Sequence, residues 1–337
     1  MSTTQTDTRS AIGRRPAISP AALLERSGLV IAWIAAIALF GILSPDTFLS
    51  SANFSTIFGS QAVLAVLALA LLVPLTAGDY DLSIAGVLSL SSMIVAVLNA
   101  KHGVPLGIAI LAALGAGLLV GAVNGAFAAL FGVDPFIVTL GTGTLLQGLV
   151  LWLSSSETIS GVSDTLSNAV ITDRFLGISL GFWYGIVLCV VMWVVFEYTP
   201  LGRRLLFVGR GRRVAALSGF NLRRLRWGAL ATSGLIAAFA GVLYAGVTGG
   251  ADPSSGASFL LPAYAAAFLG ATAIVPGRFN PWGAVIAVYF LVTGITGLTI
   301  LGAASWVQDV FYGTALVLAV SLSTWSRRRS GAAAADA

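Results

Sequence analysis

Apolar stretches of about twenty residues recur along most of this 337-residue chain, and short polar turns separate them. A bilayer core about 30 Å thick is crossed by a helix of about 20 apolar residues. Only 9% of the residues are charged, whereas soluble domains carry about 25%, so the chain cannot cover two soluble domains with a water-exposed surface. The sequence therefore predicts an all-α polytopic membrane protein.

Counting the apolar stretches predicts about ten transmembrane helices. Turn-forming sequences such as Ser44-Pro45-Asp46, Asp134-Pro135 and Pro276-Gly277 lie between them. We expect a cytoplasmic N-terminal tail at 1–27, a transmembrane domain at 28–325 and a cytoplasmic C-terminal tail at 326–337. The predicted spans lie near 28–44, 57–77, 84–99, 106–130, 136–153, 179–198, 228–248, 258–273, 283–301 and 306–325.

The basic residues are distributed unevenly among the connections. If the N-terminus is cytoplasmic and each span reverses direction, all of the 18 Lys and Arg residues except Lys101 and Arg174 fall on the inner side. This bias follows the positive-inside rule and supports both the span count and two cytoplasmic termini. Eight arginines gather between Thr199 and Trp227. That segment is either a short helix at the membrane that docks a soluble partner or a plain loop that contacts lipid headgroups.

Several classes of function are disfavoured by residues that the sequence lacks. Cys189 is the only cysteine and His102 the only histidine, so a Cys-based metal cluster and a nucleophile–base pair are not expected. Lys101, the only lysine, does not follow the glycine pattern of a P-loop, so any ATP-Mg must bind a partner subunit. No basic surface interleaved with aromatic residues indicates nucleic-acid binding. We therefore expect a transport subunit without cofactor or metal, not an enzyme.

The densest polar feature within the apolar region is the segment from Gly78 to Ser83. An uncompensated carboxylate at the centre of a membrane helix costs about 2.5–3.5 kcal/mol on insertion scales. The segment is either an interfacial turn, in which Asp81 or Ser83 caps the next helix, or a broken helix beside a substrate path. A related polar segment from Gly250 to Gly256 follows the seventh span on the opposite side, which indicates inverted repeats.

Further polar and small residues lie on the fourth and fifth predicted spans. Gly117, Gly121 and Gly125 are spaced by four, so they share one helix face and favour close helix packing. Hydroxyl and amide side chains suit an uncharged polyhydroxy ligand better than an ion. The residues expected along a translocation path are Asp79, Asp81, Ser83, Asn124, Phe136, Thr139 and Thr142.

These motifs, in this order, resemble those of the permease subunits of bacterial ABC importers for ribose, xylose and galactosides. That family belongs to a larger group that includes branched-chain amino acid permeases. The resemblance covers roughly residues 50–325 and rests on the segments Ala77 to Ser83, Asn124-Gly125, Pro135 to Thr142 and Thr199 to Gly219. Two departures stand out. The segment from Gly209 to Leu217 replaces a polar, partly acidic sequence, and the family's late glycine-rich segment appears here as Gly270 to Asn280. Asp79 occupies the position of the second glycine in the family's Gly-Gly-Ile-Asp-Leu-Ser element.

The resemblance implies a permease that passes a monosaccharide or related polyol from an extracytoplasmic sugar-binding protein into the cytoplasm. The implied partners are ATP-binding cassette ATPase subunits carrying ATP-Mg, a second permease subunit in a homodimer, and the lipid of the bacterial inner (plasma) membrane. Region 199–227 matches the family's cytoplasmic coupling region. The residues implied in ATPase coupling are Gly202, Arg203, Arg204, Arg212, Arg213, Ala215, Leu217 and Gly219.

Two alternatives stay open at this point. One is a stand-alone secondary transporter coupled to H⁺ or Na⁺ through Asp79 and Asp81. The other is an ABC permease for a non-sugar solute such as a branched-chain amino acid.

Overall fold

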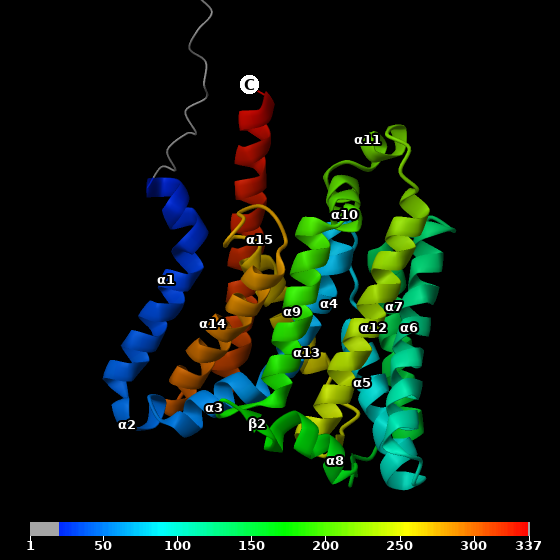
Figure 1. The fold of residues 1–337 in the computed structure, drawn as a ribbon, viewed down its shortest axis with the longest axis vertical. Coiled ribbons are helices and arrows are strands. Elements are labelled where there is room, and N and C mark those ends of the chain that lie inside the picture. The colour runs from blue at the N-terminus through cyan, green and yellow to red at the C-terminus, as the bar shows by residue number, and fades with distance from the viewer. Residues whose placement is uncertain (1–19, 336–337) are drawn as a thin grey trace, which may run out of the picture.

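The computed structural model of the protein describes residues 20–335, with side chains from 27 to 322, and it is almost entirely helical (Figure 1). The predicted tail residues 1–19 and 336–337 lie outside the described residues. The long helices are α1 (Pro20–Leu43), α3 (Ser51–Ser60), α4 (Ala62–Thr76), α5 (Ile84–Val95), α6 (Leu106–Ala129), α7 (Pro135–Ser154), α9 (Leu180–Tyr198), α10 (Pro200–Arg210), α12 (Leu222–Thr248), α13 (Ala257–Gly270), α14 (Pro281–Ile300) and α15 (Trp306–Ala335).

Short elements fill the connections. They are α2 (Pro45–Phe48), η1 (Ala96–Lys101), β1 (Ile159–Ser160), α8 (Asp164–Ser167), η2 (Asn168–Thr172), β2 (Arg174–Phe175), β3 (Ile178–Ser179), α11 (Arg212–Leu217) and β4 (Gly250–Ala251).

Each predicted span coincides with an apolar helix, which confirms an all-α polytopic membrane protein. Within the described residues, seven helical segments are long and apolar enough to cross a membrane, and the segments 27–43, 257–270 and 306–322 are apolar but shorter. The predicted limits of the tails and the transmembrane domain stay a prediction. Helix α1 is described from Pro20, a residue type that is tolerated in the first turn of a helix. Helix α15 continues past residue 325 to Ala335.

Polar N-caps followed by proline start several of the helices, as the turn sequences predict. The Asp134 carboxylate accepts the Phe136 N–H at 2.8 Å, with Pro135 as the first residue of α7. The Asn280 side chain accepts the Gly283 N–H at 2.6 Å, with Pro281 opening α14. An N-cap oxygen satisfies one backbone donor that the helix leaves unpaired, and proline at the first position has no N–H to satisfy.

Helix α4 lies at the centre of the bundle. It is apolar on all sides, and all 15 of its residues are buried, as expected for a helix that meets protein in every direction. Helices α9, α12, α13 and α14 pack around it. By contrast, α6 and α7 leave large apolar side chains exposed, including Leu111 and Trp152. These two helices therefore present an apolar outer surface.

Connections that differ in their content of arginine lie at opposite ends of the bundle (Figure 1). Helices α10 and α11, which carry five arginines, lie at the same end as the described C-terminus, whereas α8 and β2 lie at the opposite end. Arg174 of β2, one of the two basic residues predicted on the outer side, is therefore far from the arginine-rich helices. The structure thus separates these connections to two ends, as the alternation of spans predicts.

Helices α6 and α12 pack closely against each other through glycines. A Cβ atom on Gly117 would lie 2.3 Å from the Ala238 Cβ, and a Cβ atom on Gly121 would lie 2.4 Å from the Leu230 carbonyl oxygen. Gly234 of α12 approaches the Gly117 carbonyl in the same way. The predicted packing role of the glycines on α6 is therefore confirmed, and a backbone-to-backbone contact of this kind excludes any side chain.

We predict that Gly121→Ala destabilises the protein by about 1–3 kcal/mol, because overpacking forces the two helices apart. Gly115→Ala is the matched control on the same helix, since no atom lies within 4 Å of a Cβ added there. The midpoint of thermal unfolding in detergent should fall for Gly121→Ala and stay constant or rise for Gly115→Ala. Equal midpoints would contradict the packing described.

Candidate functional site

The segment 77–83 interrupts the path from α4 to α5, and we call it the first break. Helix α4 ends at Thr76, and Gly78 follows with φ +80°, a left-handed conformation that glycine adopts without strain. The segment is packed inside protein: Asp79, Asp81 and Ser83 are all buried, whereas the Tyr80 side chain is 45% exposed. Irregular backbone at membrane depth is tolerated only where protein or a polar cavity surrounds it.

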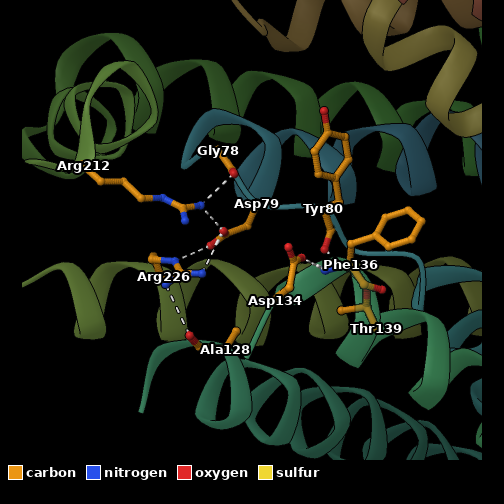
Figure 2. A network of polar contacts seen from close by, with 9 residues as sticks. All are labelled: Gly78, Asp79, Tyr80, Ala128, Asp134, Phe136, Thr139, Arg212 and Arg226. Carbon is orange, nitrogen blue, oxygen red and sulfur yellow. Dashed lines mark hydrogen bonds and ion pairs between the residues drawn. The ribbon is translucent and has the colours of Figure 1, made fainter. Parts of the chain in front are cut away.

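Asp79 lies between two arginines that are both far from it in sequence (Figure 2). Arg212 of α11 donates to the Asp79 Oδ1 atom and, at 2.9 Å, to the Gly78 carbonyl. Arg226 of α12 donates from Nε to Oδ2 at 2.8 Å and from its NH2 nitrogen to Oδ1 at 3.0 Å. Both carboxylate oxygens are thus neutralised, which compensates for removing the charge from water.

Asp81 begins a chain of buried polar side chains that runs to α6 and α7. Its Oδ1 atom accepts the Ser83 hydroxyl at 2.6 Å and the Ser83 N–H at 3.1 Å, a turn just before α5, whose N-cap residue Ser83 makes no side-chain capping bond. The Asn124 amide of α6 donates to the Ser83 hydroxyl at 2.9 Å and accepts from Thr142 of α7 at 2.7 Å. Four predicted site residues are therefore brought into one network.

Two neighbouring helices hold the backbone of the first break. Thr139 of α7 accepts the Leu82 N–H at 3.0 Å, and the Tyr264 hydroxyl of α13 accepts the Asp81 N–H at 3.1 Å. Phe136, the remaining predicted site residue, is 47% exposed and lies one turn before Thr139. In Figure 2 the Tyr80 ring points away from the Asp79 ion pairs, on the side of the break that carries Phe136.

A second break separates α12 from α13. Strand β4 pairs antiparallel with β1, and the chain then turns inward until Gly256 packs against Ala85 and Ser89 of α5. Gln147 of α7 donates to the Pro253 carbonyl at 2.8 Å. The second break enters from the bundle end opposite to α10, which is the arrangement that inverted repeats require. The repeat symmetry itself stays a prediction.

Asp252 in the second break is held ionised. Hydrogen bonds from the Ser254 side chain, at 2.6 Å, and from Thr158, at 2.8 Å, lower the pKa of Asp252 to about 2. The carboxylate is therefore charged throughout the physiological pH range and does not take up a proton there.

Helix α10 lies over the end of α4, with its arginines facing outward. Gly202, Leu205 and Val208 are buried on its inner face, whereas Arg203 and Arg204 are exposed. A Cβ atom on Gly209 would lie 2.0 Å from the Thr76 carbonyl, so the backbone of α10 rests directly on the last residue of α4.

Helix α11 continues this segment, and its predicted coupling residues divide into two groups. Arg213 and Leu217 are exposed, whereas Ala215 is buried. Gly219 ends the segment with φ +80°. Arg212 alone among these residues reaches the first break.

The sequence did not single out three residues that the structure places at the first break: Tyr80, Arg226 and Tyr264. Arg226 was noticed only as one of eight arginines, and Tyr264 lies 183 residues from its partner Asp81. No local pattern indicates such contacts. Within the described residues, no group of three or more His, Cys, Asp and Glu side chains is arranged to hold a metal ion.

An apolar helix bundle with two internal breaks, a buried polar network and an arginine-rich segment resting on one break is the architecture of a membrane transport protein. Residues 53–320 match the family described as the permease component of the branched-chain amino acid transport system, and the chain belongs to that family.

Relatives cover most of this chain and most of their own length. The D-allose transport system permease protein AlsC of Escherichia coli (strain K12) is 29% identical over 85% of this chain and 87% of its own. The ribose import permease protein RbsC of Bacillus subtilis (strain 168) is 30% identical over 89% and 93%. The fructose import permease protein FrcC of Rhizobium meliloti is 30% identical over 89% and 85%. No solved structure matches the chain.

We predict that Asn124→Ala costs about 1–3 kcal/mol of stability, because it leaves the buried Ser83 hydroxyl and the partly buried Thr142 hydroxyl without this partner. Thr144→Ala serves as the control, since the exposed Thr144 side chain bonds only to the Leu140 carbonyl of its own helix. Thermal unfolding followed by tryptophan fluorescence compares the two variants. An Asn124→Ala protein as stable as Thr144→Ala would contradict the network.

Proposed function

We propose that this chain is the membrane-spanning permease subunit of an ATP-binding cassette importer for a monosaccharide or related polyol. The observation that carries the proposal is the arginine-rich segment α10–α11 resting on the first break, where an external subunit can act on the interior of the bundle. The relatives named for import of allose, ribose and fructose support a sugar as the transported solute.

In this scheme the end of the bundle with α10 and α11 faces the cytoplasm, as do both termini, and binds ATPase subunits that carry ATP-Mg. A binding protein delivers sugar at the opposite end, near the β1–β4 pair. A second copy of the chain completes the permease, and the surrounding lipid is that of the bacterial inner membrane. Exposed apolar residues on α6 and α7, such as Leu119 and Ile137, suit contact with lipid or with the second copy.

Neutral hydroxyl and amide groups near the first break favour an uncharged solute. Asp79 is already neutralised by Arg212 and Arg226, so this carboxylate is not suited to carry a proton in an ion-coupled cycle. Asp81, the other carboxylate of that alternative, is buried and bonded to Ser83. The relatives named as transport and import permeases favour the ABC permease over the stand-alone secondary transporter. A branched-chain amino acid stays the alternative solute.

Uptake by proteoliposomes tests the transport function. The purified chain is reconstituted with the ATPase and binding protein encoded beside its gene. It should transport a labelled monosaccharide only when ATP is present on the side of the vesicle membrane that carries the ATPase. Uptake of the same sugar by the chain alone, driven by an imposed proton or sodium gradient, would replace the ABC permease with the secondary transporter. Uptake of leucine instead of sugar would revise the solute.

A charge reversal tests the docking surface separately. We expect Arg203→Glu/Arg204→Glu to reduce co-purification of the ATPase subunit about tenfold or more, because repulsion replaces attraction at an exposed interface. Membrane insertion and the unfolding midpoint should not change, since both side chains are exposed. Arg174→Glu, at the opposite end of the bundle, is the matched control and should retain the ATPase. Retention by the double variant would count against docking at α10.

A further inference from the structure

We propose that Asp79, Arg212 and Arg226 form a positioning link that carries motion of the α10–α11 segment into the first break. This inference rests on the proposed function. The three residues join the break to α11 and the first turns of α12, which follow it by 133 and 147 residues in sequence. Figure 2 shows the Asp79 carboxylate between the two guanidinium groups.

Burial makes the three charges act as a unit. The Asp79 side chain is completely buried, so losing both arginines would leave an unpaired charge away from water, whereas losing one arginine leaves the carboxylate paired with the other. Two arginines against one aspartate leave one surplus positive charge. Arg226 also donates to the Ala128 carbonyl at 3.3 Å, in the last turn of α6, where the negative end of the helix dipole offsets that surplus.

The two arginines differ in how firmly their helices are held. The Arg226 side chain is 14% exposed and belongs to α12, which packs along α4, α5 and α6. The Arg212 side chain is 46% exposed and belongs to the six-residue helix α11, whose next residue, Arg213, is exposed. We therefore assign Arg226 as the fixed anchor and Arg212 as the partner that moves with the docking segment.

Motion of that segment reaches the break through two contacts of opposite kind. The backbone of Gly209 abuts the Thr76 carbonyl and transmits a push, whereas the bonds from Arg212 to Asp79 and Gly78 transmit a pull. Beyond the break, the Leu82 and Asp81 N–H groups bond to Thr139 of α7 and Tyr264 of α13. Displacing Asp79 therefore bears on the two helices that hold the far side of the break.

The test separates ATP hydrolysis from transport in the complete reconstituted complex. Arg212→Gln should keep ATPase co-purification and binding-protein-stimulated hydrolysis, but lower the sugar imported per ATP about tenfold, which is within the range of coupling between distant sites. Asp79→Asn should lower the ratio similarly. The double variant should be no worse than Asp79→Asn alone, because Asp79→Asn already removes the ion pair that Arg212→Gln removes. Arg224→Gln, at an exposed arginine in the first turn of α12, is the matched control and should keep the wild-type ratio.

Arg212→Lys, which keeps the positive charge, should recover part of the ratio. An unchanged ratio in Arg212→Gln, additive losses in the double variant, or no recovery with lysine would overturn the link. A fall in the unfolding midpoint that parallels the fall in the ratio would also overturn it, because the three residues would then be a structural brace. Absence of ATP-dependent uptake by the wild-type complex would instead reject the proposed function on which the link depends.

Discussion

Interrupting a helix inside a membrane exposes backbone donors, acceptors and charges that water cannot reach, and every one of them needs a partner in the protein. The first break meets most of this requirement with side chains from α6, α7, α11, α12 and α13. Arg212 and Arg226 neutralise Asp79, Tyr264 and Thr139 accept backbone N–H groups, and Asn124 extends the network of Asp81. The positions of α6, α7, α11, α12 and α13 are therefore tied to one short segment.

Glycine packing makes this convergence sterically feasible. Because α6 and α12 approach each other backbone to backbone at Gly117, Gly121 and Gly234, α12 lies close enough to α6 for Arg226 to reach the Ala128 carbonyl. A larger residue at these glycines would move α12 and, with it, the anchor of the ion pairs. The small residues of one helix pair and the charges of the first break are thus parts of one arrangement.

Much of the fold could be predicted from the sequence because bilayer thickness fixes the length of an apolar helix. The predicted breaks at Ser44-Pro45, Asp134-Pro135 and Pro276-Gly277 all separate helices. The partners of the buried aspartates could not be predicted in this way. Asp79 and Arg226 lie 147 residues apart, and eight arginines in one segment look alike until the packing of α12 selects one of them.

For the site residues too, local sequence patterns predict the polar segment but not the contacts that its side chains make. Gly78-Asp79-Tyr80-Asp81 was recognisable as a costly polar segment, and its burial follows from that cost. Its assignment to a translocation path stays a prediction for Asp79, Asp81 and their neighbours. What the structure adds is that Asp79 faces the arginines of α11 and α12, whereas Tyr80 points to the other side of the break.

Helix α7 contacts both breaks, through Thr139 at the first and Gln147 at the second. Eight residues of α-helix span about 12 Å, so a nearly rigid strut fixes the spacing of the two interruptions. If α7 tilts as a rigid body about a point between these two residues, the two contacts move at the same time and in opposite directions. Such a tilt loosens the packing of one break against α7 while it tightens the packing of the other. A kink in α7 would uncouple the two contacts, so that the packing at both breaks could loosen at the same time.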